Sequence, residues 1–286
     1  MGTPHNDVEA SPDFPPPSGR SLREAVITAL VLLGLIIVFN LLGPDGFIFL
    51  ALAVVGVAMF ELLDALTQKG RRPVIPWGVA CVLAMMIVSY LERPALLLVV
   101  LATAMYGSFL LALRPNRGAT PASDAAWTLL GVAWVGGGGA GAAAILTLGD
   151  SASYILSAYV LITALDDIGG YFVGTRFGRH KMAPSISPAK SWEGWVGGLI
   201  ASLLGGLLFA GLLEELSLAD GLALGALASV LAPVGDLVES MVKREIGIKD
   251  SGRLLPGHGG LLDRLDAIMF CAPAAYLYLH HIAGLG

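Results

Sequence analysis

Charged residues are scarce in this sequence of 286 residues, since only 14% of its side chains belong to Asp, Glu, Lys or Arg. A soluble domain carries about 25% charged residues. The shortage, together with 56% hydrophobic residues and a mean hydropathy of +0.76, argues against a soluble globular protein. It predicts an all-α, polytopic membrane protein. The net charge of -5 gives no support to nucleic-acid binding.

Cysteine is nearly absent as well. Cys81 and Cys271 each lie inside an apolar run. Two isolated thiols argue against a disulfide framework and lack the spacing of a metal-binding knuckle. We therefore expect both cysteines to be buried packing side chains.

Long apolar runs make up most of the rest of the chain. A bilayer core about 30 Å thick requires about 20 apolar residues per helix. On this criterion about nine transmembrane helices are predicted, at Ala25–Leu42, Phe47–Leu66, Val74–Leu91, Pro94–Leu113, Ala126–Leu148, Tyr154–Tyr171, Trp195–Leu213, Gly221–Leu237 and Leu265–Ala283. Residues 1–23 precede them, lack the pattern of a signal peptide and are expected to form a disordered tail.

The basic residues predict an orientation, because Lys and Arg are retained in cytoplasmic connections. With the N-terminus in the cytoplasm, all 17 Lys and Arg residues except Arg93 fall on the cytoplasmic side. The acidic connection that contains Glu214 and Glu215 then lies outside, together with the C-terminus.

Polar side chains concentrate after Asp166, which divides the chain in two. Residues 24–150 are expected to form a scaffold of transmembrane helices, and residues 151–286 a catalytic transmembrane region. The catalytic region has two cytoplasmic loops, at 176–193 and 239–264. The glycine run that begins at Gly136 suits close helix packing, because no strand-loop-helix context for a phosphate loop surrounds it.

Several carboxylates lie at the ends of apolar runs, where acids are costly and persist mainly in cavities, in ion pairs or as cation ligands. They are Asp166, Asp167, Asp236, Asp263 and Asp266. Helical spacing places Asp263 and Asp266 on one face. Oxygen ligands without a Cys or His cluster favour Mg²⁺ bound together with substrate phosphates. The alternative for any single acid is a salt bridge to a neighbouring Lys or Arg.

Basic residues accompany these acids and fit the binding of phosphate oxygens. They are Lys190, Lys243, Arg244, Lys249 and Arg264. Simple anchoring by the positive-inside rule is the alternative interpretation. The run from Pro256 to Gly260 is rich in glycine, so its N–H groups can approach a phosphate beside His258.

The second cytoplasmic loop, 239–264, resembles a known family. From Ser240 to Asp266 the chain reads S-x-x-K-R-x-x-x-x-K-D, then P-G-H-G-G, then D-R-x-D, which is similar to the signature of the phosphatidate cytidylyltransferases, or CDP-diglyceride synthases. The first loop is also similar to that family in ten positions: Asp167, Tyr171, Gly174, Phe177, Gly178, Ser187, Pro188, Lys190, Glu193 and Gly194. Ser191 replaces the usual Thr but keeps a hydroxyl group, and Ala189 stands where Lys or Asn is common.

The resemblance implies a homodimeric helical enzyme in the lipid bilayer of the inner (plasma) membrane, with a cytoplasmic active site. It implies that CTP and phosphatidic acid react to give CDP-diacylglycerol and pyrophosphate, with Mg²⁺ as cofactor and K⁺ as a further candidate cation. Asp236 and Asp263 take the positions of the metal-binding acids of the family.

A mechanism follows as a hypothesis, in which the lipid phosphate attacks the α-phosphorus of CTP. Catalysis rests on positioning and on charge neutralisation. The catalytic set is predicted to be Asp236, Asp263, Asp266, Lys243 and Arg244, with Asp167 as a further metal-site acid. The substrate-binding set is predicted to be Ser187, Lys190, Ser191, Ser240, Lys249, His258, Gly259, Gly260 and Arg264.

Two other classes remain open at this point. A transporter can carry intramembrane acids that couple substrate movement to ions, but here the polar residues cluster at one membrane face. A different CDP-lipid synthase, or a phosphotransferase that consumes a nucleotide-activated lipid, would use a similar set of side chains.

Overall fold

The computed structural model describes residues 22–114, 120–248, 251–252 and 259–285, with side chains described from residue 27 onward. The predicted tail lies outside the described residues, apart from the backbone of residues 22 and 23. Two predicted substrate-binding residues, Lys249 and His258, also lie outside them.

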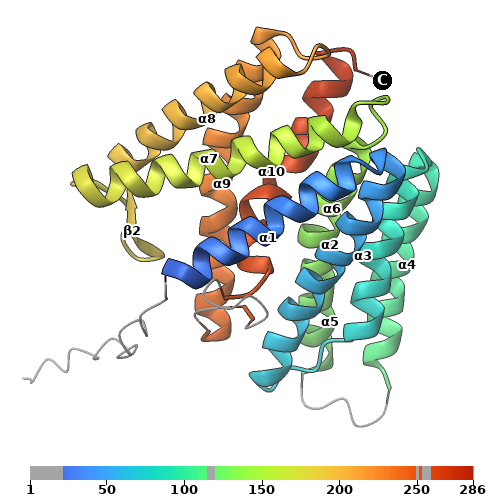
Figure 1. The fold of residues 1–286 in the computed structure, drawn as a ribbon. Helices are drawn as coiled ribbons and strands as arrows, with labels where there is room; N and C mark the ends of the chain where they lie inside the picture. Colours follow the sequence, from blue (N-terminus) through green and yellow to red (C-terminus); the bar gives the residue numbers. More distant parts are fainter. Residues whose placement is uncertain (1–21, 115–119, 249–250, 253–258, 286) are drawn as a thin grey trace, which may run out of the picture.

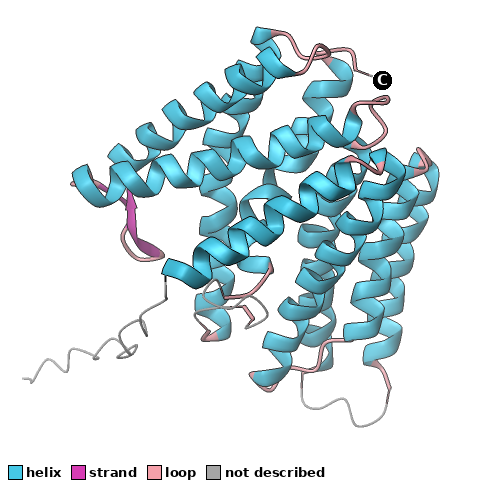
Figure 2. Cartoon of the chain, in the orientation of Figure 1, coloured by secondary structure: helices cyan, strands magenta, loops and turns pink. Residues whose placement is uncertain are grey.

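Helices account for most of the described chain (Figure 2). They are α1 (Leu22–Asn40), α2 (Gly43–Gln68), α3 (Ile75–Tyr90), α4 (Pro94–Ala112), α5 (Pro121–Gly131), the π-helical turn η1 (Val132–Gly136), α6 (Gly137–Ile145), α7 (Ala152–Phe177), α8 (Trp192–Leu212), α9 (Leu218–Ile246) and α10 (Leu262–His281). The helical class is therefore confirmed, and each of the nine predicted stretches overlaps a helix.

Length and hydropathy identify fewer membrane spans than the nine predicted. Among the described residues, six helices are long and apolar enough to cross a bilayer: α2, α4, the continuous helix Pro121–Ile145, α7, α8 and α9. The apolar parts of α1 and α3 are shorter. The chain is thus a membrane protein, while the number nine and the orientation of the termini stay predictions.

Local sequence explains where several helices begin and end. A proline occupies the first or second position of α2, α3, α4 and α5, where its missing N–H costs nothing. Ser217 and Asp220 form a reciprocal capping box at the start of α9. At the other end of α9, Gly247 adopts a left-handed conformation with φ of 76°, which a residue with a Cβ rarely adopts.

The helices form two groups with α10 between them. Helices α2 to α6 pack together in one group, and α7, α8 and α9 pack together in the other (Figure 1). Helix α10 contacts α9 and α7 in the second group, and α6 and α2 in the first. Asp263, in the first turn of α10, and Asp266, in the next turn, are therefore placed where the two halves of the chain meet.

Glycines allow close helix contacts, as expected for the run that begins at Gly136. A Cβ on Gly138 would lie 2.4 Å from the carbonyl oxygen of Met269, and one on Gly141 would lie 2.6 Å from the nitrogen of Pro273. Helix α6 thus packs directly against the backbone of α10. Both cysteines are buried free thiols, which confirms that prediction.

The loop between α7 and α8 contains a feature that the sequence did not predict. Strands β1 (Lys181–Ala183) and β2 (Ser187–Ser191) pair antiparallel as a short hairpin. Strand β2 leads directly into α8, and its last residue, Ser191, caps that helix by accepting a hydrogen bond from the N–H of Gly194 at 3.2 Å. The hairpin therefore has a fixed position relative to α8.

Candidate active site

A cavity of about 270 Å³ lies between α7, β2, α8 and α9. Its polar lining includes Asp166 and Asp167 of α7, Lys190 of β2 and Asp236 of α9. Asp166 is only 4% exposed, and its Oδ1 accepts no hydrogen bond from the described residues. A buried carboxylate oxygen without a donor is costly unless a ligand fills the role, so the cavity has the character of a binding site.

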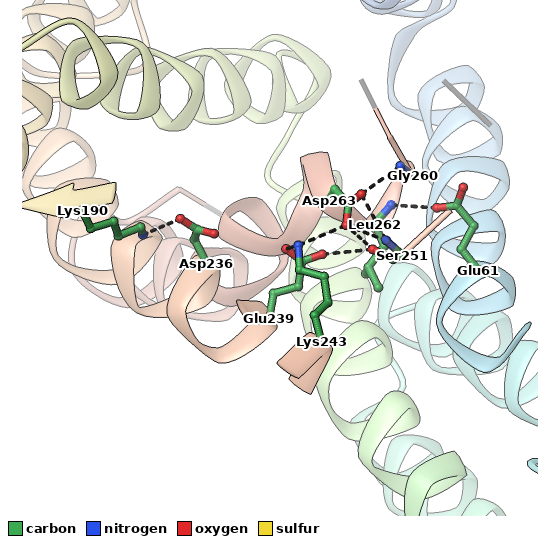
Figure 3. A network of polar contacts seen from close by, with 9 residues as sticks. All are labelled: Glu61, Lys190, Asp236, Glu239, Lys243, Ser251, Gly260, Leu262 and Asp263. Carbon is green, nitrogen blue, oxygen red and sulfur yellow. Dashed lines mark hydrogen bonds and ion pairs between the residues drawn. The ribbon is translucent and has the colours of Figure 1, made fainter. Parts of the chain in front are cut away.

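Lys190 connects the hairpin to α9. Its Nζ lies 2.6 Å from Oδ2 of Asp236 (Figure 3) and donates a hydrogen bond of 3.0 Å to the carbonyl oxygen of Pro233. Pro233 lies inside α9 and has no backbone N–H, so the carbonyl of Ser229, one turn earlier in the helix, lacks its usual helical hydrogen bond. Trp195 of α8 supplies that donor through Nε1 at 2.9 Å. The hairpin and α8 are thereby fastened to α9 beside the cavity.

Three carboxylates converge on the inner side of α9 and α10. Oxygens of Asp236, Glu239 and Asp266 all lie within 4.8 Å of one another. Glu239 and Asp266 are buried, at 1% and 6% exposed. Three buried or half-buried acids at this separation repel one another unless a cation or protons neutralise them.

Lys243 supplies one positive charge close to this group. Its Nζ lies 2.7 Å from Oε2 of Glu239 and 3.3 Å from Oδ1 of Asp263 (Figure 3). Ser251 makes a parallel connection, since its hydroxyl oxygen lies 3.2 Å from Oε1 of Glu239 and also contacts Asp263, and it can donate its proton to either carboxylate. Asp263 is therefore linked to the three carboxylates through Glu239.

The start of α10 is held by acids from both sides. Asp263 accepts hydrogen bonds from the backbone N–H of Gly260 at 2.9 Å and of Ser251 at 3.1 Å. From α2, Oε2 of Glu61 accepts a bond from the N–H of Leu262 at 3.0 Å (Figure 3). Carboxylates at this end of a helix are favoured because its free N–H groups carry partial positive charge.

The structure brings many of the predicted residues together, though not as one cluster. Asp166 and Asp167 share the cavity with Lys190 and Asp236. Among the described residues, Asp266 joins Asp236 in the group of three carboxylates. Asp263 is not a member of that group and forms an ion pair with Lys243.

The other predicted residues surround these groups. Ser187 opens β2 and Ser240 lies on α9, both half-buried. Arg244 and Arg264 are exposed on α9 and α10. Gly259 has a positive φ of 84°, and Gly260 donates to Asp263 as described above. Ser191 is buried as the cap of α8.

Sequence reasoning missed three residues of the network: Glu61, Glu239 and Ser251. Glu239 could have been found, because it lies three residues after Asp236 and four before Lys243, on the same helical face. Glu61 binds the N–H of Leu262, which is 201 residues away along the chain, and no periodicity signals such a contact.

Known proteins resemble this chain over most of its length. The sequence model of the cytidylyltransferase family matches residues 23–282. Phosphatidate cytidylyltransferase of Mycobacterium tuberculosis (strain ATCC 25618 / H37Rv) is 34% identical over 280 residues, covering 92% of this chain and 83% of that protein. Phosphatidate cytidylyltransferase of Brucella suis biovar 1 is 34% identical over 264 residues, covering 90% of this chain and 93% of that protein. The chain belongs to the cytidylyltransferase family.

Proposed function

We propose that this membrane protein is a nucleotidyltransferase that converts CTP and phosphatidate to CDP-diacylglycerol and pyrophosphate. The observation that carries the proposal is the 34% identity to phosphatidate cytidylyltransferases over nine-tenths of the chain, 92% in one relative and 90% in another. The cavity and the adjoining carboxylates supply the polar groups that such a reaction requires within a protein of apolar helices.

A divalent cation fits the group formed by Asp236, Glu239 and Asp266. Their oxygens lie within 4.8 Å of one another, and hard carboxylate oxygens are the donors that Mg²⁺ prefers. The unpartnered Oδ1 of Asp166 in the neighbouring cavity is a further candidate oxygen for a cation or a substrate donor. Bound there, Mg²⁺ would neutralise phosphate charge. Asp167 and Asp263 are proposed to support this group, and K⁺ is a further candidate cation.

Basic residues of the chain are proposed to position the phosphate groups of the substrates. Lys190 is proposed to bind a phosphate at the cavity, exchanging its contact with Asp236 for a phosphate oxygen. Lys243 is proposed to hold Glu239 and Asp263 in place and to face the triphosphate together with Arg244 and Arg264. A phosphate monoester is already largely ionised at neutral pH, so the attacking oxygen requires no strong base.

The remaining substrate contacts are assigned by the family pattern. Ser187, Ser191 and Ser240 are proposed to border the nucleotide or the lipid headgroup, and Gly259 and Gly260 to offer backbone N–H groups. Lys249 and His258, outside the described residues, are proposed to bind phosphates.

Membrane placement completes the proposal. The Lys and Arg distribution supports a cytoplasmic N-terminus, an active site on the cytoplasmic face of the inner membrane and an exported C-terminus. A homodimer is proposed from the family resemblance.

The direct test combines purified full-length protein with CTP, Mg²⁺ and phosphatidic acid in detergent micelles. We expect equal amounts of CDP-lipid and pyrophosphate. Asp236→Ala and Asp263→Ala should each lower turnover by more than roughly 100-fold, because even residues that only support metal ligands cost about 10- to 100-fold. Asp150→Asn, in the exposed turn before α7, is the control and should be fully active.

Three results would contradict the proposal in whole or in part. Full turnover in both alanine variants would remove these acids from the site. If product forms only with another lipid phosphate, the protein is still a nucleotidyltransferase, but its lipid substrate is different. Ion-coupled uptake without release of pyrophosphate would indicate a transporter.

A further inference from the structure

A carboxylate of the N-terminal half is buried against the C-terminal site. Glu61 lies on α2, in the half that the sequence assigned to scaffold, and is only 7% exposed. A charged side chain among apolar membrane helices is costly and persists where it has a specific partner. Among the described residues, Oε2 accepts a hydrogen bond from the N–H of Leu262, the first residue of α10, at 3.0 Å.

The backbone beside Glu61 leaves no room for side chains. A Cβ on Gly252 would lie 2.2 Å from Oε1 and 2.5 Å from Cδ of Glu61. A Cβ on Gly260 would lie 2.8 Å from Oε2. Real Cβ atoms do not approach other atoms this closely, so the two glycines allow the segments before α10 to close around the carboxylate of Glu61.

The same short stretch of backbone holds Asp263. Its Oδ2 accepts from the N–H of Gly260, and the residue follows Leu262 directly. Glu61 and Asp263 therefore bind neighbouring N–H groups within one turn of chain, from α2 and from α10 respectively (Figure 3). A shift of Leu262 would move Asp263, and with it the carboxylate that Lys243 and Ser251 contact.

We infer that Glu61 is a positioning residue: it fixes the start of α10 against α2 and so sets the place of Asp263 relative to Glu239 and Lys243. The inference rests on the proposed function for its kinetic consequence, but its structural part does not. Glu61 acts through Asp263. An interaction of this kind matters for rate because small displacements of a catalytic group cost turnover.

The kinetic test compares Glu61→Ala, Glu61→Gln and Asp64→Asn in the full-length protein. We expect Glu61→Ala to lower kcat by roughly 10- to 100-fold, as other supporting residues do, with KM for CTP changed by less than about 3-fold. Glu61→Gln keeps an acceptor oxygen for Leu262 and should recover most of the lost kcat. Asp64, a half-buried acid on the same helix that accepts from Gln68 at 2.7 Å, is the matched control and should show no change.

A second variant separates positioning from simple packing. Gly252→Ala should be harmful in the wild-type background, because its methyl group would meet Glu61. In the Glu61→Ala background the same change should add less than a 2-fold further loss, since the three nearest atoms all belong to the side chain that has been removed. Additive losses would contradict the inference.

Hydrogen exchange tests the structural part without reference to turnover. In Glu61→Ala, the amides of Gly260 and Leu262 should exchange at least about 10-fold faster, while peptides from α3 are unchanged. If wild-type protein makes no CDP-lipid but this local change occurs, the proposed function fails and the positioning role stands. Wild-type exchange and wild-type kcat in Glu61→Ala would overturn the inference, and so would a loss of folded protein with normal kcat in the remaining fraction.

Discussion

Lys243→Met removes the ammonium group between Glu239 and Asp263 and leaves a side chain of similar length. The two carboxylate side chains are 2% and 9% exposed, so solvent screens them poorly. With an effective dielectric constant of about 20, contacts of 2.7 and 3.3 Å correspond to attractions of about 6 and 5 kcal/mol before desolvation is subtracted. Removing one partner of a buried pair typically costs about 3–5 kcal/mol, because the remaining charge is left buried without compensation. We expect a loss of stability in this range.

Thermal unfolding of the detergent-solubilised protein, followed by tryptophan fluorescence, measures this loss. Lys243→Met should unfold well below the wild type, and Lys69→Met, at the exposed end of α2, should unfold close to it. The double variant Lys243→Met, Glu239→Gln should regain part of the loss, because it no longer buries an unpaired charge. A Lys243→Met protein as stable as the wild type would refute the reasoning and leave phosphate binding as the role of Lys243.

Two further predictions concern the packing of α8 against α9. Gly206→Ala should destabilise the protein by about 1–3 kcal/mol or more, because the new Cβ would lie 2.0 Å from a backbone oxygen of α9. Gly211→Ala, on the same helix, is the control. Its Cβ would meet no atom within 4 Å, so thermal unfolding should be unchanged. Trp195→Phe should cost about 1–3 kcal/mol because the Ser229 carbonyl loses its donor. The cost should shrink in a Pro233→Ala background, where the helix regains its own N–H, and an equal cost in both backgrounds would contradict this explanation.

The helices could be predicted because apolar runs of bilayer length leave few alternatives. Their ends could not, since α7 continues to Phe177 and α9 to Ile246, beyond the apolar stretches that end at Tyr171 and Leu237. Hydropathy indicates only the part of a helix that lipid can surround. It does not show where the helix ends, because a helix can continue into water. The hairpin was missed because strands of three and five residues carry no usable alternation.

The acids of the site could be located because charge is rare in this chain and clusters near its loops. The Lys or Arg that pairs with each acid could not be predicted, since the loops near each carboxylate contain several basic residues. Asp236 is paired with Lys190 and Asp263 with Lys243, a choice that depends on how α9 crosses α10 and the hairpin. The catalytic and binding roles of these residues stay predictions.

Helix α10 is the last helix among the described residues, and it packs against both halves of the chain. It supplies Asp263 and Asp266, and it fills the space between α6, α9 and α2. A chain without α10 would leave Asp236 and Glu239 of α9 without the third carboxylate of their group, Asp266. The faces of α6 and α9 that pack on α10 would lose their cover as well, so the apolar interior and the acidic group both depend on this one helix.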